Sequence, residues 1–486
     1  MFKKIIKKFL PKNFLLFYHK VLAYLAGFFY GWPSEKMVVI GVTGTAGKST
    51  VVNLIGRILE EAGYQVGWTS TMNFKIGKKE WLNKTKMTML GRFALQKLLK
   101  QMVKDGCQYV IIETSSEGLA QSRHLGINYD LAVFTNLFPE HLEAHGGFEN
   151  YKKAKGKLFE KLKIENKKFK IIDGKEIKKT IVVNLDDKNV EYFLGFPADE
   201  YYGYTIENSK LKSQISKIQI KNLKIIEAEN IELSKERSGF RVQDLEFEVN
   251  LLGKFNVYNI LAALSVAISQ GVDLEICQAA LEKIKNLAGR LEEINEGQDF
   301  KIFIDYAHTV GSLEKVYQLL SSLQSPGSKM IAVLGACGGG RDKWKRPIMG
   351  KIAAQYCNYI ILTNEDPYDE NPSTILDEIK VGFLQIQNQS TQNYLNARPS
   401  TKDLCSGSKF PGAEQVRYGV GKIQNYWKIL DRREAIKKAI EIAERGDLIV
   451  ITGKGCEPWI MGPNGSKIPW DDREITKKLL KETENR

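Results

Sequence analysis

The sequence predicts an α/β protein with two large domains, each built on a mainly parallel sheet. Short apolar runs that fit buried strands alternate with longer segments that fit helices, a pattern typical of parallel sheets. A chain of 486 residues with 43% hydrophobic residues can bury large cores, so global disorder is excluded. We expect a basic, apolar helical segment over residues 1–35, a central domain over 36–287 and a C-terminal domain over 288–486.

The first 31 residues carry a large share of the excess positive charge. The chain has 71 Lys and Arg against 57 Asp and Glu, and six of those lysines lie in residues 1–31 without any acid. Since the rest is only mildly basic, we expect no nucleic-acid partner. The apolar run 21–32 is shorter than the roughly 20 residues that span a bilayer. Two interpretations stay open: a helix docked on the protein's own core, and a basic helix on an anionic membrane surface.

A glycine-rich loop over residues 41–50 follows the first predicted strand, residues 37–40, and precedes a predicted helix over 51–62. This arrangement points backbone N–H groups at phosphates. The commonest spacing of such loops would need glycine in place of Val42, but the Lys-Ser-Thr ending is retained. The pattern predicts a P-loop ATPase domain, in which Lys48 reaches the terminal phosphates and Ser49 binds Mg²⁺. The residues expected to contact ATP are Thr43, Gly44, Thr45, Ala46, Gly47, Lys48, Ser49 and Thr50.

Polar residues gather after two further predicted strands, residues 109–112 and 131–134. Glu113 directly follows the first of them, and a carboxylate at the end of a parallel strand beside a phosphate loop is well placed to bind Mg²⁺. The second strand leads into a loop that holds His141 and His145, two of only five histidines in the chain, among acidic residues. This concentration favours a functional role for the loop.

These runs resemble the Mur ligase superfamily of ATP-dependent amide-forming enzymes. The resemblance is strongest to its MurE-type branch, which adds the third amino acid to the peptidoglycan precursor. The matching runs are Thr43-Gly-Thr-Ala-Gly-Lys-Ser, Glu113-Thr-Ser-Ser-Glu-Gly-Leu, Thr135-Asn-Leu-Phe-Pro-Glu-His-Leu-Glu-Ala-His-Gly and Tyr151-Lys-Lys-Ala-Lys. The resemblance implies ATP and two Mg²⁺ sites, with Ser49, Glu113, His141 and Lys155 around the metal. It also implies that Lys155 becomes carbamylated, which would turn an amine into an anionic ligand.

Further contacts follow from the same resemblance, which also implies a Rossmann-like C-terminal domain. Catalytic roles fall on Lys48, Glu113, His141 and Lys155. The residues matched to the muropeptide are Ser115, Gln121 and Arg123. The remaining ATP contacts are Asn259 at the adenine, Arg290 at the phosphates, and Asp305 with His308 after the strand predicted over 303–306. Glu117 departs from the family pattern, which has His at that position.

Three loops of the C-terminal domain resemble the family's amino-acid pocket. They bring Arg341, then Asp366, Tyr368 and Asp369, and finally Gly453 and Glu457. Enzymes that add diaminopimelate have an Arg where this chain has Tyr368, and that Arg clamps the distal carboxylate. Acidic residues in this loop, without the Arg, fit a side chain that carries an amine, so we favour L-lysine or a similar diamine over diaminopimelate. An exposed acidic turn is the alternative interpretation of residues 364–372.

The phosphate loop begins near residue 41. We expect that the residues before it leave no room for the family's N-terminal uridine-binding domain. Three explanations stay open: the acceptor is held differently, a partner supplies the uridine-binding surface, or the acceptor is lipid-linked. We predict a cytoplasmic ligase, peripheral on the membrane if residues 1–31 bind it, that adds an amino acid to a muropeptide through an acyl phosphate. The alternatives are a ligase of the folate polyglutamate or cyanophycin type, and a non-catalytic, membrane-attached nucleotide-binding partner.

Overall fold

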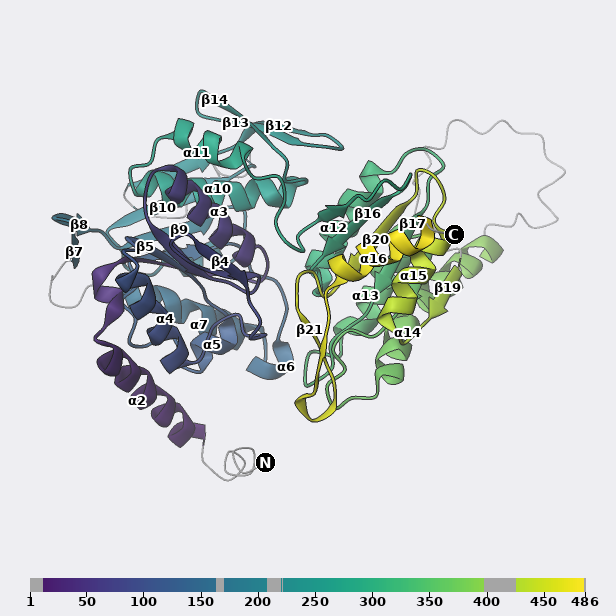
Figure 1. Cartoon of the computed structure of the whole chain (residues 1–486), viewed down its shortest axis with the longest axis horizontal. Coiled ribbons are helices and arrows are strands. Elements are labelled where there is room, and N and C mark those ends of the chain that lie inside the picture. The colour runs from purple at the N-terminus through teal and green to yellow at the C-terminus, as the bar shows by residue number, and fades with distance from the viewer. Residues whose placement is uncertain (1–11, 163–169, 208–219, 221, 397–424, 485–486) are drawn as a thin grey trace. The chain divides into compact units, whose positions relative to one another are not determined.

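The computed structural model describes residues 12–162, 170–207, 220, 222–396 and 425–484 (Figure 1). The chain forms two compact units, Met1–Leu287 and Ala288–Arg486. Each has its own sheet and its own apolar core, and each is described by itself below.

The first unit is built on a nine-stranded sheet in the order β11-β10-β9-β6-β1-β5-β2-β3-β4. Neighbouring strands are parallel except in the pairs β2–β3 and β3–β4. The predicted parallel sheet is therefore confirmed. β1, β5 and β6 are buried at every position, as expected where helices cover both faces. The strands are β1 (Val38–Thr43), β2 (Val66–Thr69), β3 (Asn73–Ile76), β4 (Lys79–Leu82), β5 (Tyr109–Glu113), β6 (Leu131–Phe134), β9 (Thr180–Asn184), β10 (Glu200–Thr205) and β11 (Leu223–Glu227).

Helices cover both faces of this sheet (Figure 1). α3, α10 and α11 lie together on one face, and α4, α5 and α7 lie on the other. The helices are α3 (Lys48–Glu61), α4 (Arg92–Lys104), α5 (Ser116–Ala120), α6 (Leu142–His145), α7 (Phe148–Phe159), α8 (Val190–Leu194), α10 (Lys254–Ser269) and α11 (Leu274–Glu282).

The described residues between 170 and 250 form three groups of strands. Strands β9, β10 and β11 continue the main sheet to one edge, because β9 pairs with β6 in parallel. β7 (Lys170–Ile172) and β8 (Lys175–Ile177) form a hairpin. A separate antiparallel sheet follows, made of β12 (Glu229–Leu233), β13 (Ser238–Val242) and β14 (Leu245–Val249).

The N-terminal helix α2 (Lys12–Tyr30) packs against α4, and the Phe29 ring lies 6.5 Å from the ring of Phe93 in α4. Ala23 and Ala26 are fully buried in it, and η1 (Pro33–Lys36) then leads into β1. Among the described residues, no helix combines the length and apolar character needed to cross a membrane. Residues 1–11, which hold four of the six N-terminal lysines, lie outside the described part of the chain.

The second unit holds a six-stranded sheet in the order β15-β16-β20-β17-β18-β19, parallel except for β15–β16. It confirms the predicted α/β C-terminal domain. Its strands are β15 (Glu292–Ile294), β16 (Lys301–Asp305), β17 (Met330–Leu334), β18 (Tyr359–Leu362), β19 (Asn425–Lys428) and β20 (Leu448–Thr452). A β21 (Trp459–Met461)–β22 (Lys467–Pro469) hairpin and η4 (Pro463–Gly465) follow. The helices are α12 (Val310–Leu323), α13 (Lys345–Tyr356), α14 (Pro372–Asn396), α15 (Arg432–Ile442) and α16 (Asp472–Glu484).

Candidate active site

The phosphate loop joins β1 directly to α3, which begins at Lys48 rather than at the predicted residue 51. Gly44 and Gly47 have φ angles of 151° and 82°, a region that glycine adopts without strain. A side chain on Gly44 would meet Thr135 Oγ1, and one on Gly47 would meet Asn259 Oδ1. The loop therefore needs glycine at both positions, and its N–H groups lie at a helix N-terminus suited to phosphate.

Residues that follow β6 stabilise the phosphate loop by hydrogen bonds to its backbone. Thr135 Oγ1 donates to the Ala46 carbonyl at 2.7 Å, and Asn136 Oδ1 accepts from the Ala46 N–H at 2.9 Å. Lys48 Nζ donates to the Thr45 carbonyl at 2.8 Å. Its ammonium group thus lies folded over the loop that would hold the phosphates.

Glu113 ends β5 beside the phosphate loop, because β5 and β1 are adjacent and Val42 pairs with Glu113. Its carboxylate is 2% exposed. Ser49 Oγ and the Thr71 N–H each donate to Oε2 at 2.7 Å, and Thr71 Oγ1 donates to Oε1 at 3.0 Å. The predicted pair of Mg²⁺ ligands, Ser49 and Glu113, is thus brought into direct contact.

Lys155 projects from α7 into the same region and is 1% exposed. Its Nζ donates to the Gly44 carbonyl at 2.6 Å and lies 4.5 Å from the centre of the Tyr151 ring. Burial, and next the nearby charge of Lys48, hold the pKa of Lys155 well below its usual value, although Glu113 and Glu140 oppose the shift. The amine is therefore far easier to deprotonate than a surface lysine.

His141 lies in the loop before α6 with a left-handed backbone, at a φ angle of 56°. Its Nδ1 is 3.9 Å from Oε1 of Glu117, the residue that departs from the family pattern. His145 Nε2 lies 3.1 Å from Ser116 Oγ. Both histidines therefore face the α5 segment.

The three residues matched to the muropeptide flank α5: Ser115 lies directly before it, and Gln121 and Arg123 lie just after it. Ser115 caps the helix, because its Oγ accepts from the Gly118 N–H at 3.2 Å. Arg123 Nη2 donates to Gln121 Oε1 at 2.8 Å, and its other terminal nitrogen donates to the Met89 carbonyl. Gln121 and Arg123 thus form one polar group. Asn259, matched to the adenine, lies in α10 with Oδ1 against Gly47.

In the second unit, Asp305 ends β16 and accepts from the backbone N–H groups of Leu291 and Ala307 at 2.8 and 2.7 Å. Burial raises its pKa, and Arg290 acts in the opposite direction. The Arg290 guanidinium lies 4.5 Å from the centre of the Tyr306 ring. Burial, and next the charge of Lys345, lower the pKa of His308 to about 3, so its imidazole is neutral at neutral pH.

The acids predicted to line the amino-acid pocket are not all together. Lys454 is fully buried, and its Nζ lies 2.9 Å from both Asp366 Oδ1 and Glu457 Oε2. Tyr306 Oη donates to Glu457 Oε1 at 3.0 Å. Asp369, in contrast, is exposed and accepts from the Asn464 N–H at 2.7 Å.

Tyr368, which stands where diaminopimelate-adding enzymes have Arg, is wedged against Gly339. Its φ angle of 53° is unusual for a bulky residue, and its N–H donates to the Met461 carbonyl at 3.0 Å. Burial, and next the charge of Asp366, raise its pKa to about 12, with Arg341 acting in the opposite direction. A neutral phenol therefore occupies this position, with Arg341 in the same electrostatic neighbourhood.

Comparison with known proteins places this arrangement in a family. Residues 42–267 match the Mur ligase middle domain, and residues 289–455 match the Mur ligase glutamate ligase domain. A UDP-N-acetylmuramyl-tripeptide synthetase of Roseiflexus sp. is 34% identical over 467 residues, which are 95% of this chain and 82% of the relative. The chain belongs to the Mur ligase family.

Other Mur ligases and related structures agree. A UDP-N-acetylmuramoyl-L-alanyl-D-glutamate–2,6-diaminopimelate ligase of Caldanaerobacter subterraneus is 35% identical, covering 95% of this chain and 82% of the relative. A solved structure of a ligase with the same name is 28% identical, with a TM-score of 0.52, and covers 92% of this chain and 79% of that one. FolC of E. coli in complex with ADP shares the fold, with a TM-score of 0.58 at 13% identity over 96% of this chain and 93% of that one.

As a Mur ligase, the chain is an ATP-dependent ligase of peptidoglycan-precursor synthesis that uses Mg²⁺, as the sequence predicted. The residues present fit such an ion. Glu113 offers a buried carboxylate, Ser49 offers a hydroxyl, and Glu140 adds a second buried carboxylate nearby. These are the hard oxygen ligands that Mg²⁺ prefers.

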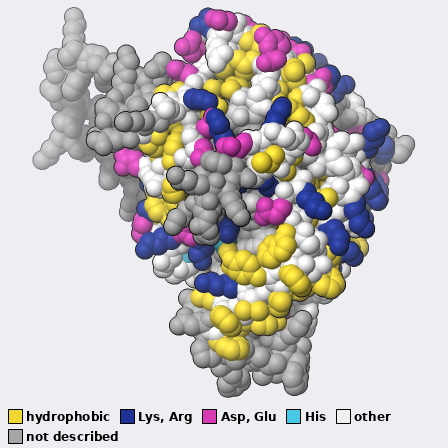
Figure 2. Space-filling model, turned by 90° about the vertical axis from the view of Figure 1, so that its left-hand side faces the viewer, with side chains coloured by type: hydrophobic (Ala, Val, Ile, Leu, Met, Phe, Trp, Pro, Cys, Tyr) yellow, Lys and Arg dark blue, Asp and Glu magenta, His cyan; other side chains and the backbone are white. Residues whose placement is uncertain are grey.

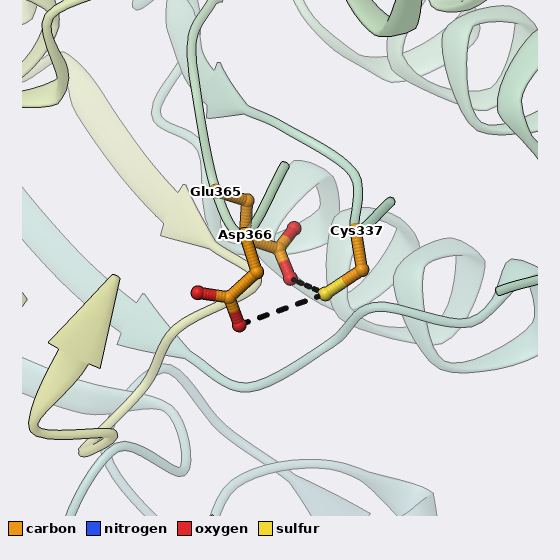
Figure 3. Close-up of side chains that lie close together, drawn as sticks. All are labelled: Cys337, Glu365 and Asp366. Carbon is orange, nitrogen blue, oxygen red and sulfur yellow. Dashed lines mark hydrogen bonds between the residues drawn. The ribbon is translucent and has the colours of Figure 1, made fainter. Parts of the chain in front are cut away.

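Three residues of the second unit belong to this region although no sequence pattern singled them out. Lys454 neutralises two of the predicted pocket acids, while Cys337 and Glu365 lie beside a third ligand-type residue, Asp366 (Figure 3). All three lie inside sequence runs that resemble the family. Each can carry charge or bind a metal and lies close in sequence to a residue that was already singled out, and this proximity could have identified them.

Proposed function

We propose that this Mur ligase joins an amino acid with a second amine group to the peptide carboxylate of a muropeptide. The acceptor carboxylate attacks the γ-phosphate of ATP, which gives an acyl phosphate and ADP. The amine of the amino acid then attacks the acyl carbon, and phosphate leaves. Activation is required because a carboxylate is a poor electrophile at neutral pH. The names of the relatives, a tripeptide synthetase and diaminopimelate ligases, support this acceptor and this class of amino acid.

The contact between Lys155 and the phosphate loop carries the proposal. A buried amine with a lowered pKa, 2.6 Å from the Gly44 carbonyl, is the form of lysine that captures CO₂. The resulting carbamate would join Ser49, Glu113 and His141 in holding Mg²⁺ at two sites. When bound, Mg²⁺ supplies positive charge against the phosphate oxygens. Lys48 would contribute the same from the protein itself.

The remaining residues divide between the two units. In the central domain, residues 36–287, we assign Ser115, Gln121 and Arg123 to the muropeptide and Asn259 to the adenine. In the second unit, residues 288–486, we assign Arg290, Asp305 and His308 to ATP. The neutral imidazole of His308 could donate or accept a hydrogen bond but would not add charge.

For the amino acid we assign Glu457 and Gly453 to the amine end, with Arg341, Asp366, Tyr368 and Asp369 around the side chain. Lys454 Nζ lies 2.9 Å from both Asp366 Oδ1 and Glu457 Oε2, so it balances the charge of these two acids, and Glu457 can accept from the incoming amine. Tyr368 lacks the guanidinium that clamps a distal carboxylate. We therefore favour L-lysine or a similar diamine over meso-diaminopimelate.

A matrix of substrates tests this function. The purified chain is incubated with ATP, one of two acceptors (a UDP-linked muramoyl dipeptide or its lipid-linked form) and lysine, ornithine or diaminopimelate. A product heavier by one amino acid, formed fastest with lysine, supports the proposal. If no acceptor and amino acid give such a product, even with cell extract added as a source of a uridine-binding partner, the proposal fails.

We further propose that α2 brings the enzyme to an anionic membrane surface. Its apolar side chains recur every three or four residues on the exposed side, which is the pattern of one helix face. Phe28 is 75% exposed and Phe29 is 69% exposed. Figure 2 shows apolar side chains gathered at the lower part of the molecule on this side. The complete stripe is Phe14, Phe17, Tyr18, Val21, Tyr24, Leu25, Phe28 and Phe29.

The charge of the segment favours lipid over a protein partner, because residues 1–31 hold six lysines and no acid. Sedimentation with vesicles of phosphatidylcholine alone or with phosphatidylglycerol tests this. We expect binding only to the anionic vesicles, and loss of binding in a Phe17→Glu/Phe28→Glu variant that still folds. Equal sedimentation of this variant and the unmodified protein would refute the assignment.

A further inference from the structure

Cys337, Glu365 and Asp366 bring three metal-ligating atoms together in the second unit (Figure 3). Cys337 follows β17, and the two acids follow β18, so all three lie at the carboxyl ends of adjacent parallel strands. Cys337 Sγ lies 3.0 Å from Glu365 Oε1 and 3.8 Å from Asp366 Oδ2. All three ligand atoms lie within 4.8 Å of one another.

Glu365 is the feature that requires an explanation. Its side chain is 2% exposed, and its Oε2 is buried without a hydrogen-bond partner. Burial, and next the charge of Asp366, raise the pKa of this carboxyl. The buried cation Lys454 forms its ion pairs with Asp366 and Glu457. The oxygen that faces Cys337 is Oε1, so a cation there would bind the carboxyl through Oε1 and neutralise a charge that is buried with its other oxygen unpaired.

The spacing of the three atoms fits a tetrahedral ion. With zinc–sulfur and zinc–oxygen bonds of about 2.3 and 2.1 Å, the edge between a sulfur and an oxygen ligand is about 3.6 Å. The two sulfur–oxygen distances, 3.0 and 3.8 Å, lie on either side of that value. Asp366 can give Oδ2 to the ion while Oδ1 keeps its contacts with Lys454 and the Met461 N–H.

We infer that Cys337, Glu365 and Asp366 form a binding site for a zinc-class divalent cation, with a fourth position for water. Its three ligands are different residues from the Mg²⁺ ligands of the first unit. It should also select a different ion, because a thiolate favours a softer ion than Mg²⁺. Binding replaces the thiol proton with the metal and releases that proton to solvent, so affinity rises with pH. The ion would join the loop after β17 to the loop after β18 and hold Asp366 in place.

Cobalt(II) is a direct probe, because a cobalt–thiolate bond absorbs in the near ultraviolet and a cobalt–oxygen bond does not. The full chain is first saturated with Mg²⁺ to fill oxygen-ligand sites and is then titrated with Co²⁺. We expect a thiolate band that saturates at one equivalent and is removed by Zn²⁺. The band should vanish in Cys337→Ser and remain in Cys456→Ser, a control that changes another buried thiol of the same unit.

Absence of the band in the unmodified protein, or its persistence in Cys337→Ser, would overturn the inference. A second measurement needs no variant. Zn²⁺ should protect Cys337 of the unmodified protein from alkylation by iodoacetamide, measured by peptide mass spectrometry, by at least tenfold. Equal labelling with and without Zn²⁺ would also overturn it. Neither experiment contains ATP or acceptor, so its result is independent of the proposed ligase reaction.

Discussion

Lys155 gives the sharpest prediction, because carbamylation requires the neutral amine. The lowered pKa of Lys155 means that the neutral form is populated at a lower pH than for a surface lysine. At a fixed concentration of dissolved CO₂, the carbamylated fraction should therefore rise with pH through that lowered pKa and fall below it, where the ammonium form dominates. Removing CO₂ and bicarbonate should inactivate the enzyme reversibly.

The expected size of the effect follows from the position of Lys155. Without the carbamate, the site loses an anionic metal ligand and retains a positive or neutral group near Lys48, Glu113 and Glu140. Metal-ion stabilisation of a transition state contributes several kcal/mol. Loss of about 3–4 kcal/mol corresponds to a decrease in kcat of roughly 10²- to 10³-fold at 1.36 kcal/mol per tenfold.

The assay combines kinetics with direct detection of the modification. Kcat is measured for Lys155→Ala and for the unmodified enzyme in CO₂-free buffer, before and after bicarbonate is restored. Carbon-13 NMR with labelled bicarbonate should show one carbamate signal that Lys155→Ala lacks, while Lys153→Ala, on the same helix, keeps it. Full activity of Lys155→Ala, or identical spectra for all three proteins, would refute the reasoning.

Three further predictions concern other parts of the chain. Arg432→Met leaves Asp472 as an uncompensated buried charge in a pair that is 0% exposed on both sides. This change should lower the free energy of unfolding by about 3–5 kcal/mol. At about 2–4 °C per kcal/mol, Tm measured by calorimetry should fall by roughly 6–20 °C, and a fall of less than about 2 °C would contradict this prediction. Tyr368→Arg should raise kcat/KM for diaminopimelate, relative to kcat/KM for lysine, by about 10- to 100-fold, since a charged hydrogen bond contributes about 1.5–3 kcal/mol. An unchanged ratio of the two values would argue against a role for this position. Gly44→Ala should weaken ATP binding at least tenfold by calorimetric titration, because the new methyl group meets Thr135, and unchanged affinity would exclude the loop as the ATP site.

Much of the site could be predicted from the sequence because its residues follow buried parallel strands. Glu113 comes directly after an apolar run, and parallel strands deliver their carboxyl ends to one edge of a sheet. The same rule explains why Asp305 could be singled out at the end of β16. The fold class was predictable for a similar reason, since alternation of strands and helices leaves few topologies.

Contacts between residues far apart in the chain could not be predicted in this way. The ion pairs of Lys454 depend on how the loops after β18 and β20 meet, and Asp366 lies 88 residues away. The addition of β9 to the main sheet likewise depends on its pairing with β6. For α2, the sequence left open whether its apolar side chains face the core or the outside. The stripe that includes Phe28 is exposed, whereas the small Ala23 and Ala26 of the same helix are fully buried.

The most direct test of the ligase mechanism follows the oxygen atoms of the acceptor. A muropeptide labelled with oxygen-18 in its terminal carboxylate is incubated with the enzyme, ATP, Mg²⁺ and lysine, and the released phosphate is analysed by mass spectrometry. An acyl-phosphate route transfers one labelled oxygen from each carboxylate to phosphate, and Lys48→Ala should abolish the release. Unlabelled phosphate, or release that does not depend on both the acceptor and the amino acid, would contradict the account.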